Sequence, residues 1–371
     1  MTGQEISFRV DASLQIGTGH VMRCLTLADA LKAAGASCRF ICREHPGHLL
    51  GLIRQRGHAA IALPEIVVDL SPAAREHPFQ PAHADWLGAD WPTDAGQTQM
   101  ALQGLVSDWL IVDHYALDAR WESAVKTKYR KLMVIDDLAD REHICDLLLD
   151  QNLVEGMANR YRGKVPGHCV CLVGPQYALL RPEFRALRPA SLARRKMPDL
   201  NRLLIFMGGS DPDNETGKVL DGVSLSRKLW EHIDVVVGEN YSALQTLKET
   251  LAKFPSATLH IQTPDMAKLM AAADLAITAG GSVTWEKCIL GLPSLVVILG
   301  ENQRPIAMMM HQLGTQRTLG MASELTPACY AKYLEGMVIG ELPSMIDCAS
   351  NVCDGSGVEE VLKILCNGKR I

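Results

Sequence analysis

A glycine turn presents a histidine near the start of the chain. The segment RVDASLQIGTGHVMRC (residues 9–24) holds Gly17 and Gly19, and it places His20 where an apolar helix-like pattern begins. Imidazole has an ordinary pKa of about 6.5, so a neutral histidine can accept a proton near neutral pH. His20 is therefore either a general base presented by the turn or a structural histidine at the start of a helix.

Two more glycine turns follow apolar runs in the second half of the chain. They are Gly208-Gly209-Ser210 and Gly280-Gly281-Ser282-Val283. Glycine allows a close approach to the backbone, and the free N–H groups of a following helix attract phosphate. Any α/β protein needs tight turns, so one such turn is weak evidence. Three at matching positions favour phosphate binding.

Glu286 lies about one turn into the helix expected after the third glycine turn. It is one residue too far from Ser282 to complete a capping box. It is either a surface glutamate of the kind favoured near a helix N-terminus or an acceptor for the hydroxyl groups of a ribose. In the second case the turn would hold the diphosphate of the same nucleotide.

Polar residues also end two of the expected strands. Asp11 follows the run at 6–10, and Asp113 and Tyr115 end the run at 109–115. Strand-end aspartates often cap loops, but they can equally orient a catalytic histidine or a water. Both interpretations stay open for these residues.

The elements that would position these residues alternate between strand and helix patterns. Apolar runs such as 37–43 and 131–137 are typical of parallel strands covered on both faces. The segment 180–202 interrupts this rhythm with three prolines and clustered arginines. We therefore predict an α/β protein with two doubly wound, Rossmann-like domains, at 1–190 and 200–371. Ligands of such domains bind beyond the carboxyl ends of the strands.

Composition excludes several classes of protein. The 371 residues carry a net charge of −5, and the arginines are dispersed apart from a cluster at 192–196, so nucleic acid is not an expected partner. The longest apolar run, 292–300, is too short to cross a bilayer, and the N-terminus shows no signal-peptide pattern. The eleven cysteines are scattered and indicate reduced thiols. We expect a soluble cytoplasmic protein, whose oligomeric state stays open.

Two patterns could suggest a metal site. Asp211-Pro212-Asp213 has the D-x-D spacing, but Asp213 is placed to cap a helix beginning near Asn214. His45 and His48 flank a Pro-Gly turn, which is unsuited to a helical ligand pair. We expect neither a metal nor another cofactor.

The third glycine turn carries a specific resemblance. The spacing of Gly280, Glu286 and the Gly-Leu-Pro at 291–293 resembles the nucleotide-binding signature of the GT-B glycosyltransferase that adds N-acetylglucosamine to the peptidoglycan lipid intermediate. The resemblance implies that Glu286 binds the ribose of UDP. It also implies that Asn302 and Gln303, which follow the next strand, contact the donor sugar.

A broader resemblance covers almost the whole chain. It rests on six motifs in order: RVDASLQIGTGHVMRC, IVDHYALD, VIDDLADR, YALLRPEF, FMGGSDPDN and DGSGVEEV. Together they resemble the UDP-2,4-diacetamido-2,4,6-trideoxy-β-L-altropyranose hydrolases, which remove UDP during pseudaminic acid biosynthesis. The resemblance implies a GT-B-like fold, with two Rossmann-like domains facing a central cleft.

The resemblance also implies a metal-independent reaction in which water attacks the anomeric carbon with inversion. The family's proton acceptor corresponds to His20, and a substrate-binding arginine corresponds to Arg181, which would pair with diphosphate. Asp113 or Tyr115 would position the water or an acetamido group, with Asp11 at the same edge.

Trp285 departs from the family pattern, because some members carry an asparagine there that contacts substrate. Tryptophan cannot replace an amide, so the contact passes to Ser282 or Thr284, or Trp285 packs on the uracil or the sugar. Two other functions stay open: a GT-B transferase with a UDP-N-acetyl-sugar donor, and a non-catalytic UDP-sugar-binding module.

Overall fold

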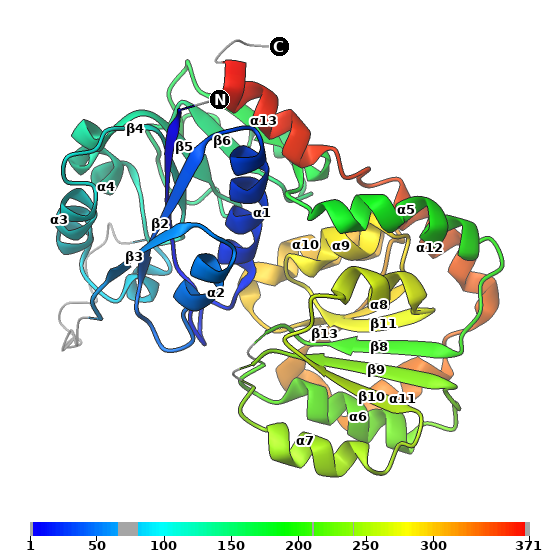
Figure 1. Cartoon of the computed structure of the whole chain (residues 1–371). Coiled ribbons are helices and arrows are strands. Elements are labelled where there is room, and N and C mark those ends of the chain that lie inside the picture. Colours follow the sequence, from blue (N-terminus) through cyan, green and yellow to red (C-terminus); the bar gives the residue numbers. More distant parts are fainter. Residues whose placement is uncertain (1–2, 66–80, 210, 240, 368–371) are drawn as a thin grey trace. The chain divides into compact units, whose positions relative to one another are not determined.

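The computed structural model describes residues 3–65, 81–209, 211–239 and 241–367. The chain divides into two compact units (Figure 1). Unit 1 comprises Met1–Asn152, Gly156–Leu179 and Gly357–Ile371, and unit 2 comprises Leu153–Glu155 and Leu180–Ser356.

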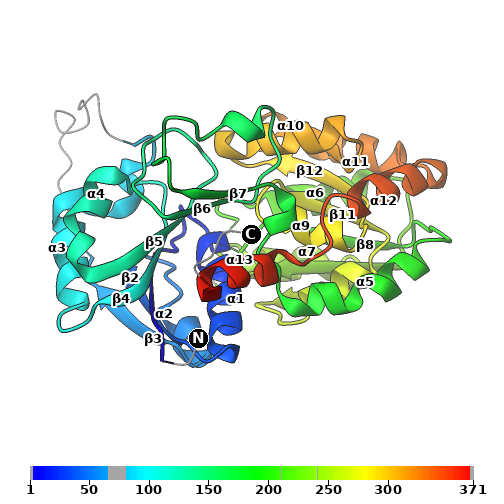
Figure 2. The same ribbon diagram turned by 90° about the horizontal axis from the view of Figure 1, so that it is seen from above.

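Unit 1 is built on a seven-stranded parallel sheet of order β3-β2-β1-β4-β5-β6-β7. Its strands are β1 (Glu5–Val10), β2 (Ser37–Arg43), β3 (Ala59–Leu63), β4 (Ser107–Asp113), β5 (Tyr129–Ile135), β6 (Leu147–Asp150) and β7 (Val170–Val173). Its helices are α1 (Gly19–Ala33), α2 (Leu50–Gln55), α3 (Trp91–Ala101), α4 (Ala119–Ala124) and α13 (Gly357–Asn367). Helices α1 and α13 lie on one side of the sheet, and α3 and α4 on the other (Figure 2).

Unit 2 is built on a six-stranded parallel sheet of order β10-β9-β8-β11-β12-β13. Its strands are β8 (Arg202–Phe206), β9 (His232–Val237), β10 (Ala257–Ile261), β11 (Leu275–Ala279), β12 (Ser294–Ile298) and β13 (Arg317–Met321). Its helices are α5 (Pro182–Arg194), α6 (Glu215–Leu225), α7 (Leu244–Leu251), α8 (Met266–Ala272), α9 (Val283–Ile289), α10 (Arg304–Gln312), α11 (Pro327–Glu335) and α12 (Leu342–Ser350). Helices α5, α8 and α9 cover one face, and α6, α7 and α11 the other (Figure 1).

Short 3₁₀ helices connect several of these elements. They are η2 (Ala84–Leu87), η3 (Lys126–Lys128), η4 (Met157–Asn159), η5 (Pro175–Tyr177), η6 (Glu301–Gln303), η7 (Ala322–Glu324) and η8 (Ile339–Glu341). The sequence from 64 to 95 shows no hydrophobic period and predicts a loop, and in the described part of this stretch the prediction is wrong from Ala84 onward. There η2 forms, and α3 begins at Trp91 behind Asp90, whose carboxylate caps it by accepting the Thr93 N–H.

Both sheets reverse their strand order at one point, which is where doubly wound folds bind ligands. In unit 1 the reversal lies between β1 and β4, where Val10 pairs with Asp113. In unit 2 it lies between β8 and β11, where Phe206 pairs with Thr278. The predicted α/β class with two Rossmann-like sheets is confirmed. The three glycine turns, the first with His20, follow β1, β8 and β11, and Asp113 ends β4, all at these reversals.

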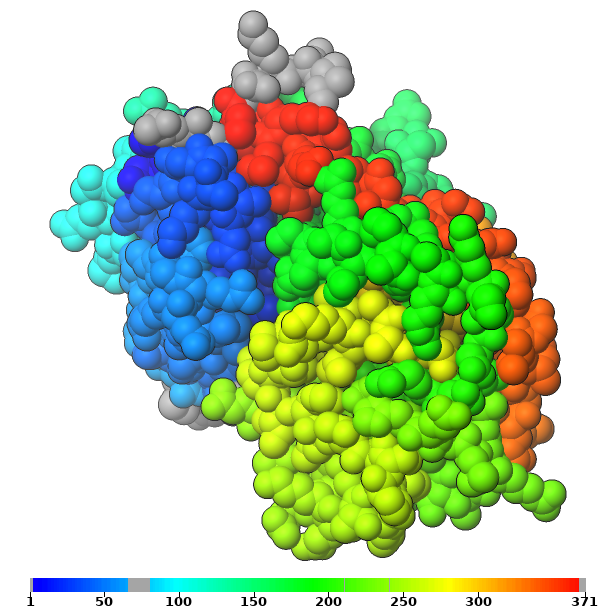
Figure 3. Space-filling model, turned by 45° about the vertical axis from the view of Figure 1, so that its right-hand side comes forward, coloured from blue at the N-terminus to red at the C-terminus, as the bar shows by residue number. Residues whose placement is uncertain are grey.

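The units differ from the predicted domains 1–190 and 200–371 in three places, the shortest of which is Leu153–Glu155, a part of unit 2. Helix α13, at the end of the chain, buries Val361 and Leu365 in the core of unit 1 and lies beside α1 on its surface (Figure 3). Helix α5 belongs to unit 2, because Arg188 and Ser191 donate hydrogen bonds to the carbonyls of Ile289 and Leu290.

Candidate active site

His20 and Asp113 form a hydrogen-bonded pair at the strand reversal of unit 1. Nδ1 of His20, in the first turn of α1, lies 2.6 Å from Oδ1 of Asp113, at the end of β4. Burial alone would raise the pKa of the Asp113 carboxyl, but Arg23 and His20 outweigh it and hold that pKa well below its ordinary value. The ionised carboxylate therefore accepts the Nδ1–H. Nε2 is then left as a proton acceptor, without a hydrogen-bond partner among the described residues.

Arg23 clamps the same carboxylate. Its Nε and Nη2 donate to the two oxygens of Asp113 at 2.6 and 2.7 Å, and its Nη1 donates to Asp137 at 3.1 Å. Because Arg23 is three residues after His20, both side chains lie on one face of α1. The forked contact fixes the orientation of Asp113 and so the orientation of the imidazole.

Tyr115 lies against the imidazole ring of His20. The two rings meet edge to face with centroids 4.7 Å apart, and the Tyr115 hydroxyl donates to Asp137. Burial, and then the charge of Asp137, raises the pKa of Tyr115 well above its ordinary value. The phenol is therefore neutral and acts as a hydrogen-bond donor, not as a base.

Asp11 lies in a different network, inside the core. Its carboxylate forms an ion pair with Arg9 at 2.7 Å and accepts the backbone N–H of Arg43 at 2.7 Å, and His114 Nε2 lies 3.3 Å away. Burial raises the pKa of Asp11, but Arg9 and His114 outweigh it, and the pKa falls well below its ordinary value. The predicted substrate contact of Asp11 conflicts with this burial, because its side chain has no exposed surface.

The turn before His20 is closed by its own backbone. The Gly17 N–H donates to the Ser13 carbonyl at 2.9 Å. Gly17 has φ +78°, a conformation that favours glycine, whereas Gly19 is simply the first residue of α1. The turn therefore fixes the chain in front of His20.

The second glycine turn leads to a helix that the protein caps itself. The Asp211 carboxylate accepts the N–H groups of Glu215 and Thr216 at 2.8 and 2.9 Å, and Asn214 accepts that of Gly217. The predicted cap, Asp213, is therefore wrong. Gly208, with φ +99°, and Gly209 precede this cap, and Ser210 lies outside the described residues.

The third turn lies between β11 and α9, and α9 has no side-chain cap. Gly280 and Gly281 pack against Gln303: a Cβ on them would lie 3.5 Å from its Oε1 and 3.9 Å from its Nε2, respectively. Gln303 itself accepts the N–H of Leu299 at 3.1 Å. The structure thus brings the turn and Gln303 together, while Asn302 lies beside Gly300.

Glu286 and Arg181, which were predicted from separate motifs, form a pair within unit 2. Arg181 Nη2 lies 3.4 Å from Glu286 Oε1, and Nη1 lies 3.1 Å from Glu183 Oε1. The Glu286 side chain is 22% exposed. Burial raises its pKa, and Arg181 only partly opposes this effect. The pair offers one carboxylate and one guanidinium to a ligand.

Two neighbours in α9 do not fit their predicted contacts. Trp285 is 1% exposed and Val283 is also buried, so both side chains belong to the interior of unit 2. Packing of Trp285 on a uracil or a sugar conflicts with this burial. Thr284, the suggested substitute, uses its hydroxyl to donate to the Gly281 carbonyl at 2.8 Å.

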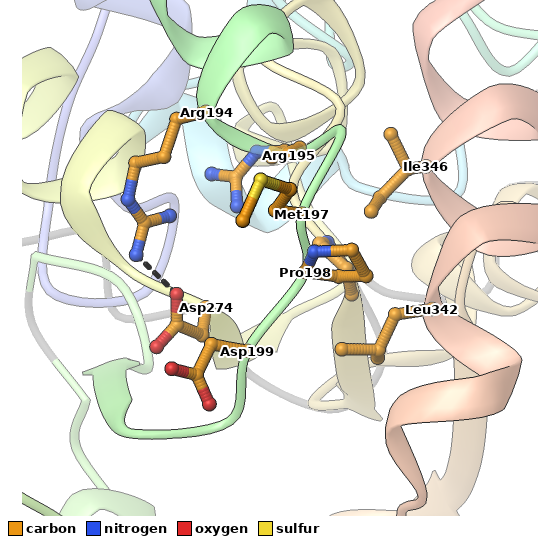
Figure 4. A pocket seen from close by; sticks show the side chains of 9 residues that line it. Arg194, Arg195, Met197, Pro198, Asp199, Asp274, Leu342 and Ile346 are labelled. Carbon is orange, nitrogen blue, oxygen red and sulfur yellow. Dashed lines mark hydrogen bonds and ion pairs between the residues drawn. The ribbon is translucent and has the colours of Figure 1, made fainter.

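A small pocket of unit 2 lies at the opposite, amino ends of its strands (Figure 4). Its lining residues are Arg194, Arg195, Met197, Pro198, Asp199, Asp274, Pro293, Leu342 and Ile346. Arg194 pairs with Asp274, and Arg195 donates to the carbonyls of Met270, Ala273 and Leu290. These charges hold the fold together, so we assign the pocket no chemistry.

No group of three or more metal-ligating side chains occurs in the described ranges of the chain, and none of the helices described is long and apolar enough to cross a membrane.

The chain is similar to several known proteins. No family model matches the chain. It is 25% identical over 311 residues to the UDP-2,4-diacetamido-2,4,6-trideoxy-β-L-altropyranose hydrolase of Campylobacter jejuni, with 84% of this chain and 97% of that protein covered. The resemblance predicted from the motifs is confirmed.

Two other relatives are similar over part of their length. The chain is 30% identical to the spore coat polysaccharide biosynthesis protein SpsG of Bacillus subtilis over 56% of this chain, and 24% identical to an uncharacterized protein of Methanocaldococcus jannaschii over 81% of it. It spans only 61% and 57% of the lengths of these two relatives.

Solved structures with the same fold cover nearly the whole chain. Acinetobacter baumannii MurG has a TM-score of 0.65 at 14% identity, with 98% of this chain and 99% of that chain covered. Arabidopsis thaliana UGT89C1 complexed with UDP has a TM-score of 0.64 at 13% identity, with 98% and 100% covered. The fold is therefore GT-B-like.

The sequence analysis missed two residues of the unit 1 site. Arg23 lies inside the GTGHVMRC motif, and Asp137 ends the VIDD run after β5. Their signal was present, since Arg23 follows His20 at helical spacing and Asp137 lies two residues after β5, a strand two positions from β1 in the sheet.

Proposed function

We propose that the chain is an enzyme acting on UDP-sugars, and specifically a hydrolase that removes UDP from UDP-2,4-diacetamido-2,4,6-trideoxy-β-L-altropyranose. The observation that carries the proposal is the His20–Asp113 pair, with Nε2 free to accept a proton. The similarity to the C. jejuni hydrolase and the GT-B-like fold support the substrate class.

In the proposed mechanism His20 Nε2 takes a proton from water as the water oxygen bonds to the anomeric carbon. The bond from that carbon to the diphosphate oxygen breaks with inversion, and its electron pair leaves with UDP. Asp113 stays ionised and stabilises the imidazolium that forms. Such general-base catalysis is worth on the order of 10²–10⁴-fold.

Unit 2 supplies the nucleotide-binding groups in this proposal. The glycine turn at 280–281 lets the diphosphate approach the backbone, Glu286 accepts a hydroxyl of the ribose, and Arg181 contributes positive charge. Diphosphate is a good leaving group, so these groups suffice without a metal, and we expect turnover to persist in EDTA.

Replacing Asp113 with asparagine should lower kcat about 100-fold and leave KM nearly unchanged. The amide can neither stabilise the imidazolium nor hold the Nδ1–H tautomer of His20. UDP release with the full UDP-sugar measures the effect. UDP affinity, determined by calorimetry, serves as the control, because the proposed nucleotide contacts lie in unit 2. Unchanged kcat in a folded variant would contradict the role of Asp113.

Replacing Glu286 with glutamine should weaken UDP binding about tenfold, since a hydrogen bond to a charged group is worth about 1.5–3 kcal/mol. Burial raises the Glu286 pKa, so the wild-type carboxylate becomes protonated at a higher pH than an ordinary glutamate. Wild-type affinity should therefore fall more steeply than that of E286Q as pH is lowered.

The matched control is Glu183→Gln, because Glu183 also pairs with Arg181 but is more exposed. Calorimetric titration with UDP across the pH range measures all three proteins. Parallel pH curves for wild type and E286Q would remove Glu286 from the nucleotide site.

A GT-B transferase with a UDP-N-acetyl-sugar donor is the second candidate, and the fold of MurG favours it. Release of UDP that requires an added lipid or glycan acceptor would select it over the hydrolase.

A further inference from the structure

Three aromatic rings lie together beside His20 in unit 1. The ring centroids of His83 and Trp86 are 4.3 Å apart, and those of Trp86 and Tyr115 are 5.5 Å apart with the planes 28° from parallel. The ring centroids of His83 and Tyr115 are 5.4 Å apart, and the Tyr115 ring also packs edge to face on His20. Trp86 lies in η2, His83 directly precedes it and Tyr115 follows β4 by two residues, so the segment before α3 is brought to the catalytic edge of the sheet.

The η2 segment is fixed firmly enough to hold these rings in place. Leu87 is buried in the core that includes Leu110 and Val112 of β4. Gly88 follows with φ +65°, and a Cβ there would lie 2.5 Å from His45 Cε1 and 3.1 Å from Arg43 Cδ. Only glycine lets the backbone turn at this position, and the turn anchors the segment.

Trp86 and His83 are half-buried, in contrast to the fully buried Trp121 on the same side of the sheet. Burial lowers the pKa of His83, so its ring is neutral at neutral pH. Polarisable, uncharged ring surface that remains partly open is suited to apolar parts of a ligand.

We propose that His83 and Trp86, backed by the buried ring of Tyr115, form an aromatic subsite that binds the sugar of the substrate through its C–H face and its methyl groups. This inference rests on the proposed function, because His20 then acts at the anomeric carbon and the sugar ring extends from that carbon. A 6-deoxy sugar with two acetamido groups carries three methyl groups that can pack on such rings. Hydroxyl groups in their place would lose hydrogen bonds to water without replacement.

The subsite gives the segment around η2 a role in substrate selection. Replacing Trp86 with alanine should raise KM for UDP-2,4-diacetamido-2,4,6-trideoxy-β-L-altropyranose on the order of tenfold, with a smaller effect on kcat. Trp86→Phe should retain most of the affinity. UDP alone should bind the alanine variant as it binds wild type.

Trp91→Ala is the matched control. Trp91 is also half-buried and lies a few residues away, but its ring faces Arg120. A wild-type KM in Trp86→Ala would overturn the subsite. Equal losses of affinity for UDP and for the UDP-sugar would also overturn it, because the rings would then contact the uracil.

A fluorescence titration separates failure of the subsite from failure of the proposed function. The free sugar, 2,4-diacetamido-2,4,6-trideoxy-altropyranose, should change the tryptophan emission of wild type and of Trp91→Phe, but not that of Trp86→Phe. If wild type turns over no UDP-sugar, the proposed function fails, and this titration alone decides the subsite. Identical emission changes in wild type and Trp86→Phe would overturn it.

Discussion

Replacing His20 with glutamine should lower kcat for UDP release about 10²- to 10⁴-fold, the range that general-base catalysis contributes. Glutamine has a similar reach and can donate to Asp113, but it cannot take the proton of the attacking water. The side chain of His20 is only 11% exposed, so its size matters and glutamine disturbs the packing less than alanine. KM should change little, because the base acts in the transition state.

His168→Gln is the matched control, since His168 is an exposed histidine of the same unit and lies 3.6 Å from Asp146. Steady-state UDP release at fixed pH measures both variants. A His20→Gln variant that keeps the wild-type kcat would remove His20 from the mechanism.

Replacing Asp94 with asparagine should lower the free energy of unfolding of unit 1 by about 3–5 kcal/mol, the typical cost of breaking a buried ion pair. The Asp94 carboxylate accepts hydrogen bonds from the guanidinium groups of Arg9 and Arg43, each at 2.6 Å, and from the indole N–H of Trp121 at 2.9 Å. All three partners are buried, so two guanidinium groups would lose their shared charge partner inside the core.

Asp29→Asn provides the comparison, because Asp29 pairs with Arg56 and His58 at a partly exposed site. Losing the Asp29 ion pairs should lower the free energy of unfolding by at most about 1 kcal/mol. Urea denaturation followed by circular dichroism measures both. Equal destabilisation by the two substitutions would show that the Arg9–Asp94–Arg43 network contributes no more than a surface pair.

The fold could be predicted from the sequence because each strand is a nearly continuous apolar run followed by a turn and a helix pattern. The same logic placed His20 and Asp113 at strand ends. Their pairing also required β1 and β4 to be neighbours, which follows from the strand order and not from either segment alone. Arg181 and Glu286, 105 residues apart, likewise meet only through tertiary structure.

Residue type at a strand or helix end predicted neither burial nor the residue that caps a helix. Asp11 and Asp113 are both buried at strand ends, but Asp11 pairs with Arg9 whereas Asp113 pairs with His20 and Arg23. Trp285 neighbours Glu286, but α9 is buried nearly all round, and Glu286 alone among its residues is partly exposed. Asp213 had the spacing of a cap, and the left-handed conformation of Asn214 gave that position to Asn214 instead.

The most direct test of the account is UDP release from UDP-2,4-diacetamido-2,4,6-trideoxy-β-L-altropyranose in heavy-oxygen water, with EDTA present and no acceptor. Wild-type protein should release UDP, and the label should appear on the anomeric carbon of the sugar, with none in UDP. Label in the diphosphate, or no release until a lipid or glycan acceptor is added, would contradict hydrolysis at the anomeric carbon.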